Sequence, residues 1–296
     1  MKETTDHRFE LLLAIVIAAR ATSFMFSKIL LESMGEFDLM AIRFLLAFGL
    51  LCAVFPKKLR MDRKTFLGGM VIGVMYFLVL SCELKALQTA DSSLVSLLEN
   101  CAIIFVPVIG IVLFRRLPKK ITVVCTAVAF AGVVCLALQQ GRLTGSFGWG
   151  LMSAVLYAIA IIVTSKVTAE ETDPLSAGIV QLGTMGALSL AAAVGFRELM
   201  LPREPRQWFM ILALAAVCSS FGFAFQTVAQ SRVPAARAGL FCAISPAVSA
   251  ILGVIVLREQ LGVWGVIGLA LILFSIVLPY LRSDRSPAPR SPVPRR

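Results

Sequence analysis

Histidine is almost absent from this sequence: the single one, His7, precedes the first long apolar segment. A histidine-based metal centre within the apolar segments is therefore excluded, and the commonest general base of enzymes is missing there. The patterns H-E-x-x-H, G-x-S-x-G and G-x-x-x-x-G-K-[ST] are absent as well, so zinc proteolysis, serine hydrolysis and ATP hydrolysis lack their usual machinery. We expect no cofactor, no metal and no enzyme activity.

Charged residues are scarce, at 15% of the 296 residues, whereas 58% are hydrophobic and the mean hydropathy is +0.89. A soluble domain is usually about 45–50% apolar and about 25% charged, so the composition indicates a polytopic membrane protein. The net charge of +11 is then explained by basic loops beside membrane spans rather than by nucleic-acid binding. All seven cysteines lie in apolar segments and are expected to be small buried side chains.

Apolar stretches of membrane-spanning length occur throughout the chain. Gly69 and Gly73, four residues apart in one of these stretches, predict a close helix contact within the chain. We predict an all-α polytopic membrane protein with ten transmembrane helices, at Phe9–Leu31, Leu39–Phe55, Thr65–Cys82, Ser93–Phe114, Ile121–Leu138, Gly148–Val167, Leu175–Phe196, Trp208–Gln230, Ala235–Leu257 and Val263–Leu281.

The spans divide into two halves that share an order of features. Lys166 follows Lys28 by 138 residues, and Gln181 follows Arg43 by the same 138. Because five spans per half is an odd number, the halves must have opposite orientations, which makes an inverted repeat. The predicted units are a first repeat, a second repeat and a disordered, basic, proline-rich tail: 9–138, 148–281 and 282–296.

The charge of the loops predicts the orientation of these halves. With the N-terminus in the cytoplasm, 19 Lys and Arg residues lie in inner segments and 6 in outer segments. Cytoplasmic loops carry an excess of Lys and Arg. Both termini are therefore expected in the cytoplasm.

The stretch Ser92–Pro118 carries polar residues inside a predicted span. On a helix Ser96, Glu99 and Pro107 fall close to one face. A carboxylate that faces lipid costs several kcal/mol, so this face should point at a cavity or at another helix. A substrate pathway is one interpretation, and an interior helix with satisfied polar residues is the alternative. Pro107 here and Pro246 in the ninth span are helix-break candidates.

Three basic residues, Arg20, Lys28 and Arg43, lie within the first two spans, with Glu99 as the only clear acidic residue well inside a span. Lys28 and Arg43 lie near the outer end and are expected to reach toward it. Arg20 is deeper. It either pairs with Glu99 in a buried bridge or faces an aqueous cavity and attracts an anionic group of a substrate.

Short motifs in both halves resemble the EamA family of the drug/metabolite transporter superfamily, over about residues 10–138 and 148–281. The motifs are Phe24 with Lys28, Arg43-Phe44-Leu45-Leu46-Ala47, Leu98-Glu99-Asn100 with Val106-Pro107-Val108, and Ser245-Pro246 with Glu259. The sequence departs from the family pattern in carrying Arg20 for a Trp, Arg115 for a Glu and Arg258 for a Gly. The family has a neutral Trp at the position of Arg20, so its fold does not need a charge there. The resemblance therefore favours the interpretation in which Arg20 faces an aqueous cavity over the one in which it forms a buried bridge with Glu99.

The resemblance implies a secondary transporter that exports or exchanges a small metabolite, such as an amino acid, across the inner (cytoplasmic) membrane by alternating access. Spans 1–4 and 6–9 would line the site, and spans 5 and 10 would be scaffold or homodimer helices. The implied partners are a small-molecule substrate and the lipid bilayer. A non-transporting membrane sensor or assembly protein is the alternative, ahead of a membrane enzyme. The candidate cavity residues are Arg20, Arg43, Tyr76, Ser81, Ser96, Glu99, Asn100, Tyr157, Gln181, Ser219, Gln226 and Ser245.

Overall fold

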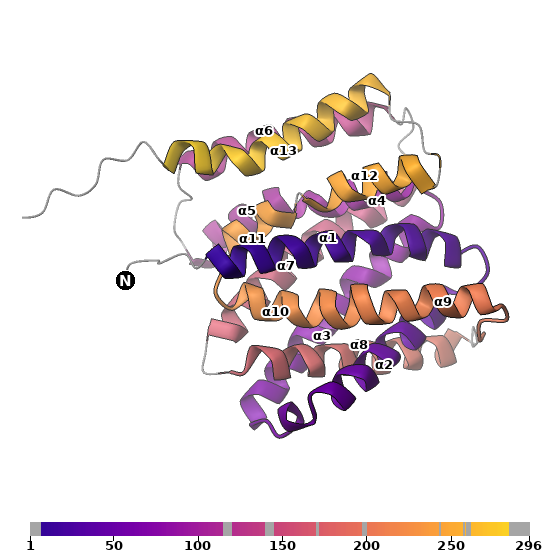
Figure 1. The fold of residues 1–296 in the computed structure, drawn as a ribbon. Helices are drawn as coiled ribbons and strands as arrows, with labels where there is room; N and C mark the ends of the chain where they lie inside the picture. The colour runs from indigo at the N-terminus through magenta and orange to yellow at the C-terminus, as the bar shows by residue number, and fades with distance from the viewer. Residues whose placement is uncertain are drawn as a thin grey trace, which may run out of the picture.

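The computed structural model describes residues 7–114, 120–139, 145–169, 172–196, 200–242, 244–256, 258 and 262–283. Within these ranges all regular structure is helical, and no strand occurs. The helices run side by side in one bundle (Figure 1). The expectation of an all-helical fold is confirmed.

The first part of the chain forms helices whose starts follow from local sequence. The Asp62 carboxylate caps α3, because it accepts hydrogen bonds from the N–H groups of Lys64 and Thr65 at 3.1 and 3.2 Å and so satisfies two donors of the first turn. α3 continues to Leu87 instead of ending at Cys82 as predicted. The helices are α1 (His7–Leu30), α2 (Glu36–Val54), the short 3₁₀ helix η1 (Pro56–Leu59), α3 (Arg63–Leu87), α4 (Ser92–Asn100), α5 (Ala102–Phe114) and α6 (Lys120–Gln139).

The second part contains a long helix of mixed type. It begins with Pro205 at the first helical position, where Glu204 and Gln207 form a capping box. It then widens into a π-helix and returns to α geometry, as one stretch from α9 (Pro205–Ala213) through η2 (Leu214–Ala224) to α10 (Phe225–Gln230). The other helices are α7 (Gly145–Ala169), α8 (Pro174–Phe196), α11 (Ala235–Cys242), α12 (Ile244–Val256) and α13 (Val263–Ser283).

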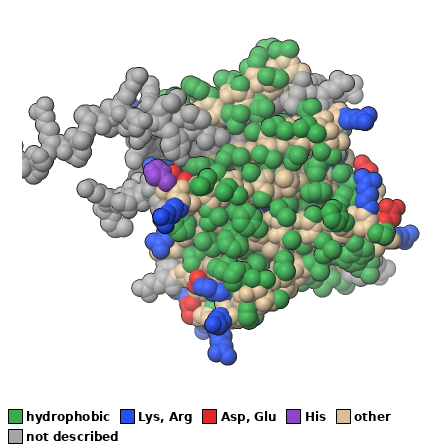
Figure 2. Space-filling model, viewed as in Figure 1, with side chains coloured by type: hydrophobic (Ala, Val, Ile, Leu, Met, Phe, Trp, Pro, Cys, Tyr) green, Lys and Arg blue, Asp and Glu red, His purple; other side chains and the backbone are tan. Residues whose placement is uncertain are grey.

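Eight helical stretches within the described ranges are long and apolar enough to cross a membrane. The apolar parts of α6 and α13 are shorter, at Val123–Gly132 and Val263–Ser275. Figure 2 shows hydrophobic side chains over the middle of the helices and charged side chains gathered toward their two ends, as a bilayer requires. The chain is a multi-pass membrane protein, and ten spans stay a prediction.

The fourth predicted span is interrupted. Its helix has a turn at Cys101, whose N–H bonds to the carbonyl of Leu98 at 3.0 Å. The Asn100 side chain donates to the carbonyl of Ser96 at 2.6 Å, and side chains that bond to nearby carbonyls compete with helical pairing. The helix break expected at Pro107 is wrong, because α5 runs through that residue.

The second helix-break candidate lies at a helix start. Pro246 is in the first turn of α12, where the N–H that proline lacks has no partner within the helix. Ala243, just before α12, is outside the described residues, as are Arg115 and Glu259 of the family-like motifs. The first residues of the predicted disordered tail, Arg282 and Ser283, belong to α13, and the remaining tail is outside the description.

Close contacts between sequence-distant helices assemble the bundle. A Cβ on Gly69 would lie 2.7 Å from the carbonyl oxygen of Ala177, and one on Gly73 would lie 2.6 Å from Cβ of Thr184. The glycine pair therefore lets α3 approach α8 within the chain, as predicted. α2 also packs on α8, α3 on α7, and α1 on η2 and α12. α6 and α13 pack on each other along one side (Figure 1).

Candidate functional site

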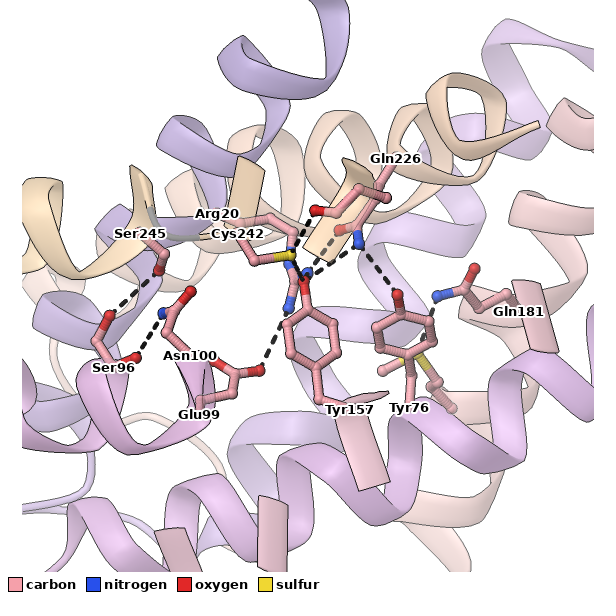
Figure 3. Close-up of polar contacts among 12 residues, drawn as sticks. Arg20, Tyr76, Ser96, Glu99, Asn100, Tyr157, Gln181, Gln226, Cys242 and Ser245 are labelled. Atoms are coloured by element: carbon pink, nitrogen blue, oxygen red, sulfur yellow. Dashed lines mark hydrogen bonds and ion pairs between the residues drawn. The ribbon is translucent and has the colours of Figure 1, made fainter. Parts of the chain in front are cut away.

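Arg20, in the middle of α1, is the centre of a buried polar cluster. One terminal nitrogen, Nη1, donates hydrogen bonds to the Tyr157 hydroxyl at 2.9 Å and to Oε1 of Gln226 at 2.5 Å. The guanidinium carbon lies 4.0 Å from the ring centre of Phe223, 5.4 Å from that of Tyr157 and 5.7 Å from that of Tyr76. Aromatic faces attract a desolvated cation. The charge is therefore held by α3, α7, η2 and α10 together. Figure 3 shows Tyr76, Tyr157 and Gln226 beside Arg20.

The aromatic residues around Arg20 are themselves locked in place. Tyr76 packs edge-on against Phe223 at 5.4 Å and against Tyr157 at 6.0 Å between ring centres. The amide nitrogen of Gln226 donates to the Tyr76 hydroxyl at 3.0 Å. These contacts fix the positions of the hydroxyl groups that Arg20 meets.

The π-helix η2 makes room for the arginine. A Cβ on Gly222 would lie 2.6 Å from Cγ of Arg20, so a side chain at this position would displace either the arginine or η2. The neighbouring Phe223 then lies against the guanidinium. π-Helical segments are rare and occur frequently at functional sites.

Glu99 lies on the other side of the arginine. Its Oε1 is 4.0 Å from Nη2 of Arg20, and both side chains are almost completely buried. Beside it the Ser96 hydroxyl lies 3.2 Å from the Ser245 hydroxyl, which joins α4 to α12 (Figure 3). Arg20 therefore approaches Glu99, and a small cavity lies beside both residues.

The cavity beside Arg20 is small and polar. Its volume is about 10 Å³, and it is lined by Ile17, Arg20, Phe24, Glu99, Asn100, Tyr157, Cys242 and Ser245. Three buried atoms of the cluster have no hydrogen-bond partner in the described structure: Nε of Arg20, Oε1 of Glu99 and Oδ1 of Asn100. Such a volume holds about one water molecule. In this conformation the site is closed to a metabolite.

Arg43 and Glu83 extend the cluster and correct two expectations. Arg43 is fully buried, with Nε donating to the Ser219 hydroxyl at 2.9 Å, so it does not reach the outer surface. Glu83 is only 1% exposed and interacts electrostatically with Glu99, Arg20 and Arg43. The expectation that Glu99 is the only acidic residue deep in a span is wrong, because α3 continues one turn beyond Glu83.

Lys28 reaches the end of α3 at the predicted outer side, where its ammonium group is held by backbone carbonyls. Its ammonium group donates to the carbonyls of Leu87 and Ala90 at 2.8 and 2.7 Å. The last carbonyls of a helix lack partners and favour a cation. Lys28 therefore ties α1 to the end of α3.

The structure brings together eight of the predicted site residues. Arg43 and Ser219 adjoin this set as a pair. Gln181 accepts a hydrogen bond from Thr227 at 2.9 Å, and Ser81 donates to the carbonyl of Phe77 at 2.8 Å and lines a separate pocket. The eight are Arg20, Tyr76, Ser96, Glu99, Asn100, Tyr157, Gln226 and Ser245.

Sequence reasoning missed four participants: Gly222, Phe223, Cys242 and Glu83. Cys242 lies 3.3 Å from the Tyr157 hydroxyl. An apolar residue in an apolar span gives no sequence signal that it takes part in a site. Glu83, in contrast, could have been found by extending the third predicted span past Cys82. No group of His, Cys, Asp and Glu among the described residues could hold a metal ion. The site offers a cation, a carboxylate and an amide oxygen at one cavity, an arrangement suited to binding a small polar molecule.

Comparison with known proteins identifies the family of the chain. The profile of the EamA-like transporter family matches residues 8–138 and 146–281. A protein of Archaeoglobus fulgidus described as an uncharacterized transporter is 27% identical over 267 residues, which cover 86% of this chain and 91% of that protein. A solved structure described only as "Crystal structure of protein" shares the fold, with a TM-score of 0.72, 17% identity and coverage of 95% of this chain and 99% of the other. The chain belongs to the EamA-like transporter family.

Proposed function

We propose that this protein is a secondary transporter of the drug/metabolite type that binds a small zwitterion, such as an amino acid, between Arg20 and Glu99. The observation that carries the proposal is the set of buried atoms without partners around one cavity: Nε of Arg20, Oε1 of Glu99 and Oδ1 of Asn100. A buried polar group without a partner costs about 1–3 kcal/mol. A substrate carboxylate at Arg20 and an ammonium group at Glu99 and Asn100 would satisfy all three.

The proposed mechanism is alternating access between two inverted five-span halves, 9–138 and 148–281. The packing between the halves supports the repeat, because each contact has a counterpart when equivalent helices are exchanged. The equivalent pairs are α1 and α7, α2 and α8, α3 and η2, α5 and α12, and α6 and α13. The contact of α3 with α7 corresponds to that of η2 with α1, the contact of α3 with α8 to that of η2 with α2, and the contact of α1 with α12 to that of α7 with α5. α6 packs on its own equivalent, α13. The family profile also matches the two halves separately. Such repeats usually rock against each other around a site at their interface.

The site lies where these halves meet. Arg20 and Glu99 belong to the first half, whereas Tyr157, Gln226 and Ser245 belong to the second. A cavity of about 10 Å³ admits a substrate only if the halves separate. Separation on one side would break the contacts of Arg20 with Tyr157 and Gln226, and closure around a substrate would restore them. The closed conformation corresponds to an occluded state of this cycle.

The location proposed is the inner membrane, with both termini in the cytoplasm and with α6 and α13 as scaffold or homodimer helices. The excess of basic residues in the inner loops supports this orientation. A non-transporting sensor would share the helical composition, but it gives no reason for three buried polar atoms without hydrogen bonds around a cavity between two halves.

The test is counterflow in proteoliposomes. Cells that overproduce the protein are first screened with amino acids and toxic analogues for increased tolerance, and the compound found is then used inside and outside the vesicles. We expect exchange by the unaltered protein and at least a tenfold loss in Arg20→Gln and in Asn100→Leu. Ser81→Ala, which changes a residue outside the cluster, is the matched control. Absence of exchange of any screened compound, or equal exchange in all variants, would contradict the proposal.

A further inference from the structure

A long groove opens on the outer surface of the bundle, away from the Arg20 cluster. It has a volume of about 950 Å³ and lies between α2, α3 and α8. Apolar side chains such as Leu45, Phe48, Phe66, Met70 and Leu188 form most of its wall. The volume is at the upper end of the range of about 300–1,000 Å³ that is usual for ligand sites.

The groove lies along the contact of α2 with α8, which belong to the two proposed halves. A Cβ on Gly183 would lie 3.0 Å from the ring of Phe48, and one on Gly186 would lie 2.9 Å from the side chain of Leu45. α8 therefore lies close against α2 at these glycines. A molecule bound in the groove would touch both sides of the contact.

The length of the groove fits one leaflet of a bilayer. The lining residues of α8 run from Ile179 to Leu188, a rise of about 13.5 Å at 1.5 Å per residue. The hydrocarbon core of a bilayer is about 30 Å thick, so one leaflet contributes roughly 15 Å. An extended acyl chain of one leaflet would follow the groove from end to end.

The groove has a basic end at headgroup depth. Asp62 and Arg63, at the start of α3, line that end. The Asp62 carboxylate is occupied by the N–H groups that it caps, whereas Arg63 is exposed. Lys57 and Arg60, on the turn that precedes α3, are exposed as well. Basic side chains beside a span attract anionic lipid.

We propose that the groove binds one anionic phospholipid, with an acyl chain along α8 and the headgroup phosphate at Arg63. The lipid belongs to the leaflet next to η1, which is the cytoplasmic leaflet in the orientation proposed above. By contacting α2, α3 and α8 together it stabilises the packing between the halves. This proposal concerns lipid binding and does not depend on the identity of a substrate.

The test uses purified full-length protein in detergent, with phosphatidylglycerol and phosphatidylcholine of identical chains as probes. Native mass spectrometry gives the number and affinity of bound lipids, and thermal unfolding gives their effect on stability. We expect one phosphatidylglycerol to bind in preference to phosphatidylcholine and to raise the melting temperature. Ala187→Trp fills the groove, because Ala187 is an exposed residue of its wall, and should abolish this binding. Ala53→Trp, at an exposed position of α2 outside the groove, is the matched control.

A second variant separates the headgroup from the chain. Arg63→Gln should weaken phosphatidylglycerol binding about fivefold, the change that corresponds to roughly 1 kcal/mol for one basic side chain at an anionic surface, and should leave phosphatidylcholine binding unchanged. Arg206→Gln, at an exposed position in the first turn of α9 and outside the groove, is its control. Equal binding of the two lipids, full binding by Ala187→Trp, or a dimer that Ala187→Trp dissociates would overturn the proposal.

Discussion

The contact between Arg20 and Glu99 leads to a prediction about stability in which the two residues are not equivalent. The guanidinium and the carboxylate lie 4.0 Å apart and are both buried. Arg20 has further partners in Tyr157 and Gln226 and in the ring of Phe223. Oε1 of Glu99 has no hydrogen bond in the described structure. The perturbations are Arg20→Gln, Glu99→Gln and the double substitution.

The magnitudes follow from these contacts. Two unit charges 4 Å apart attract by about 4 kcal/mol at an effective dielectric constant of 20, much of which is offset by the cost of burying them. Arg20→Gln also removes two hydrogen bonds from a charged donor, worth about 1.5–3 kcal/mol each. We expect a loss of about 3–5 kcal/mol for Arg20→Gln, as is usual when one member of a buried pair is removed. Glu99→Gln should lose less, because the remaining charge keeps its other partners.

The assay is equilibrium unfolding of the three variants in detergent, alongside the unaltered protein. For residues in contact, the double variant should be more stable than the sum of the single losses implies, by roughly 0.5–3 kcal/mol. The reasoning fails if Glu99→Gln costs as much as Arg20→Gln, or if the two losses add. It also fails if Arg20→Gln unfolds like the unaltered protein, since the hydrogen bonds and ring contacts would then contribute nothing.

Three further predictions concern η2, the orientation and one exposed ion pair. Gly222→Ala places a methyl group 2.6 Å from Cγ of Arg20, so it should destabilise the protein by roughly 1–3 kcal/mol through overpacking, whereas Gly195→Ala, with nothing within 4 Å, should not. A reporter fused after the C-terminus should be active as a cytoplasmic reporter and one fused near Glu204 as an external one; the reverse result at either point would contradict the inverted repeat. Burial raises the pKa of Asp173, but a hydrogen bond from Ser176 and the ion pair with Lys58 at 2.9 Å outweigh it and leave the pKa below its ordinary value of 3.8. A carboxyl group whose pKa is lower in the folded protein contributes stability above its unfolded pKa, and this stability is lost as the pH falls through its folded pKa. The melting temperatures of the unaltered protein and Asp173→Asn should therefore converge below about pH 4.

The helical bundle could be predicted because hydropathy alone identifies helices of membrane-spanning length. A close helix contact within the chain also followed from Gly69 and Gly73, since small residues four apart allow close approach, but the partner helix, α8, did not. The interruption at Cys101 could not be predicted in this way. It depends on the Asn100 side chain bonding to a carbonyl and on an N–H that bonds three residues back, whereas the sequence drew attention to Pro107.

Most of the polar residues of the site could be predicted, because a charged or amide side chain deep in a span must face a partner or a cavity. Which partner each one meets could not. Gln226 was one of the candidates from sequence, but its bonds to both Arg20 and Tyr76 could not be foreseen. Its orientation depends on the π-helical turns that precede it, and no local pattern in Leu214–Ala224 indicates that geometry.

The missed carboxylate changes how the site is understood. With Glu99 alone, the buried Arg20 and Arg43 would leave a net positive charge in the middle of the bundle, and an anionic substrate would be the natural complement. Glu83 is buried as well, and a charged Glu83 together with a charged Glu99 would balance the two arginines. An uncompensated charge in a low-dielectric interior is strongly unfavourable, and a substrate with a net charge would create one each time it bound. A zwitterion adds no net charge and still meets a cation at one end and a carboxylate at the other, and for this reason we propose a zwitterion rather than a simple anion.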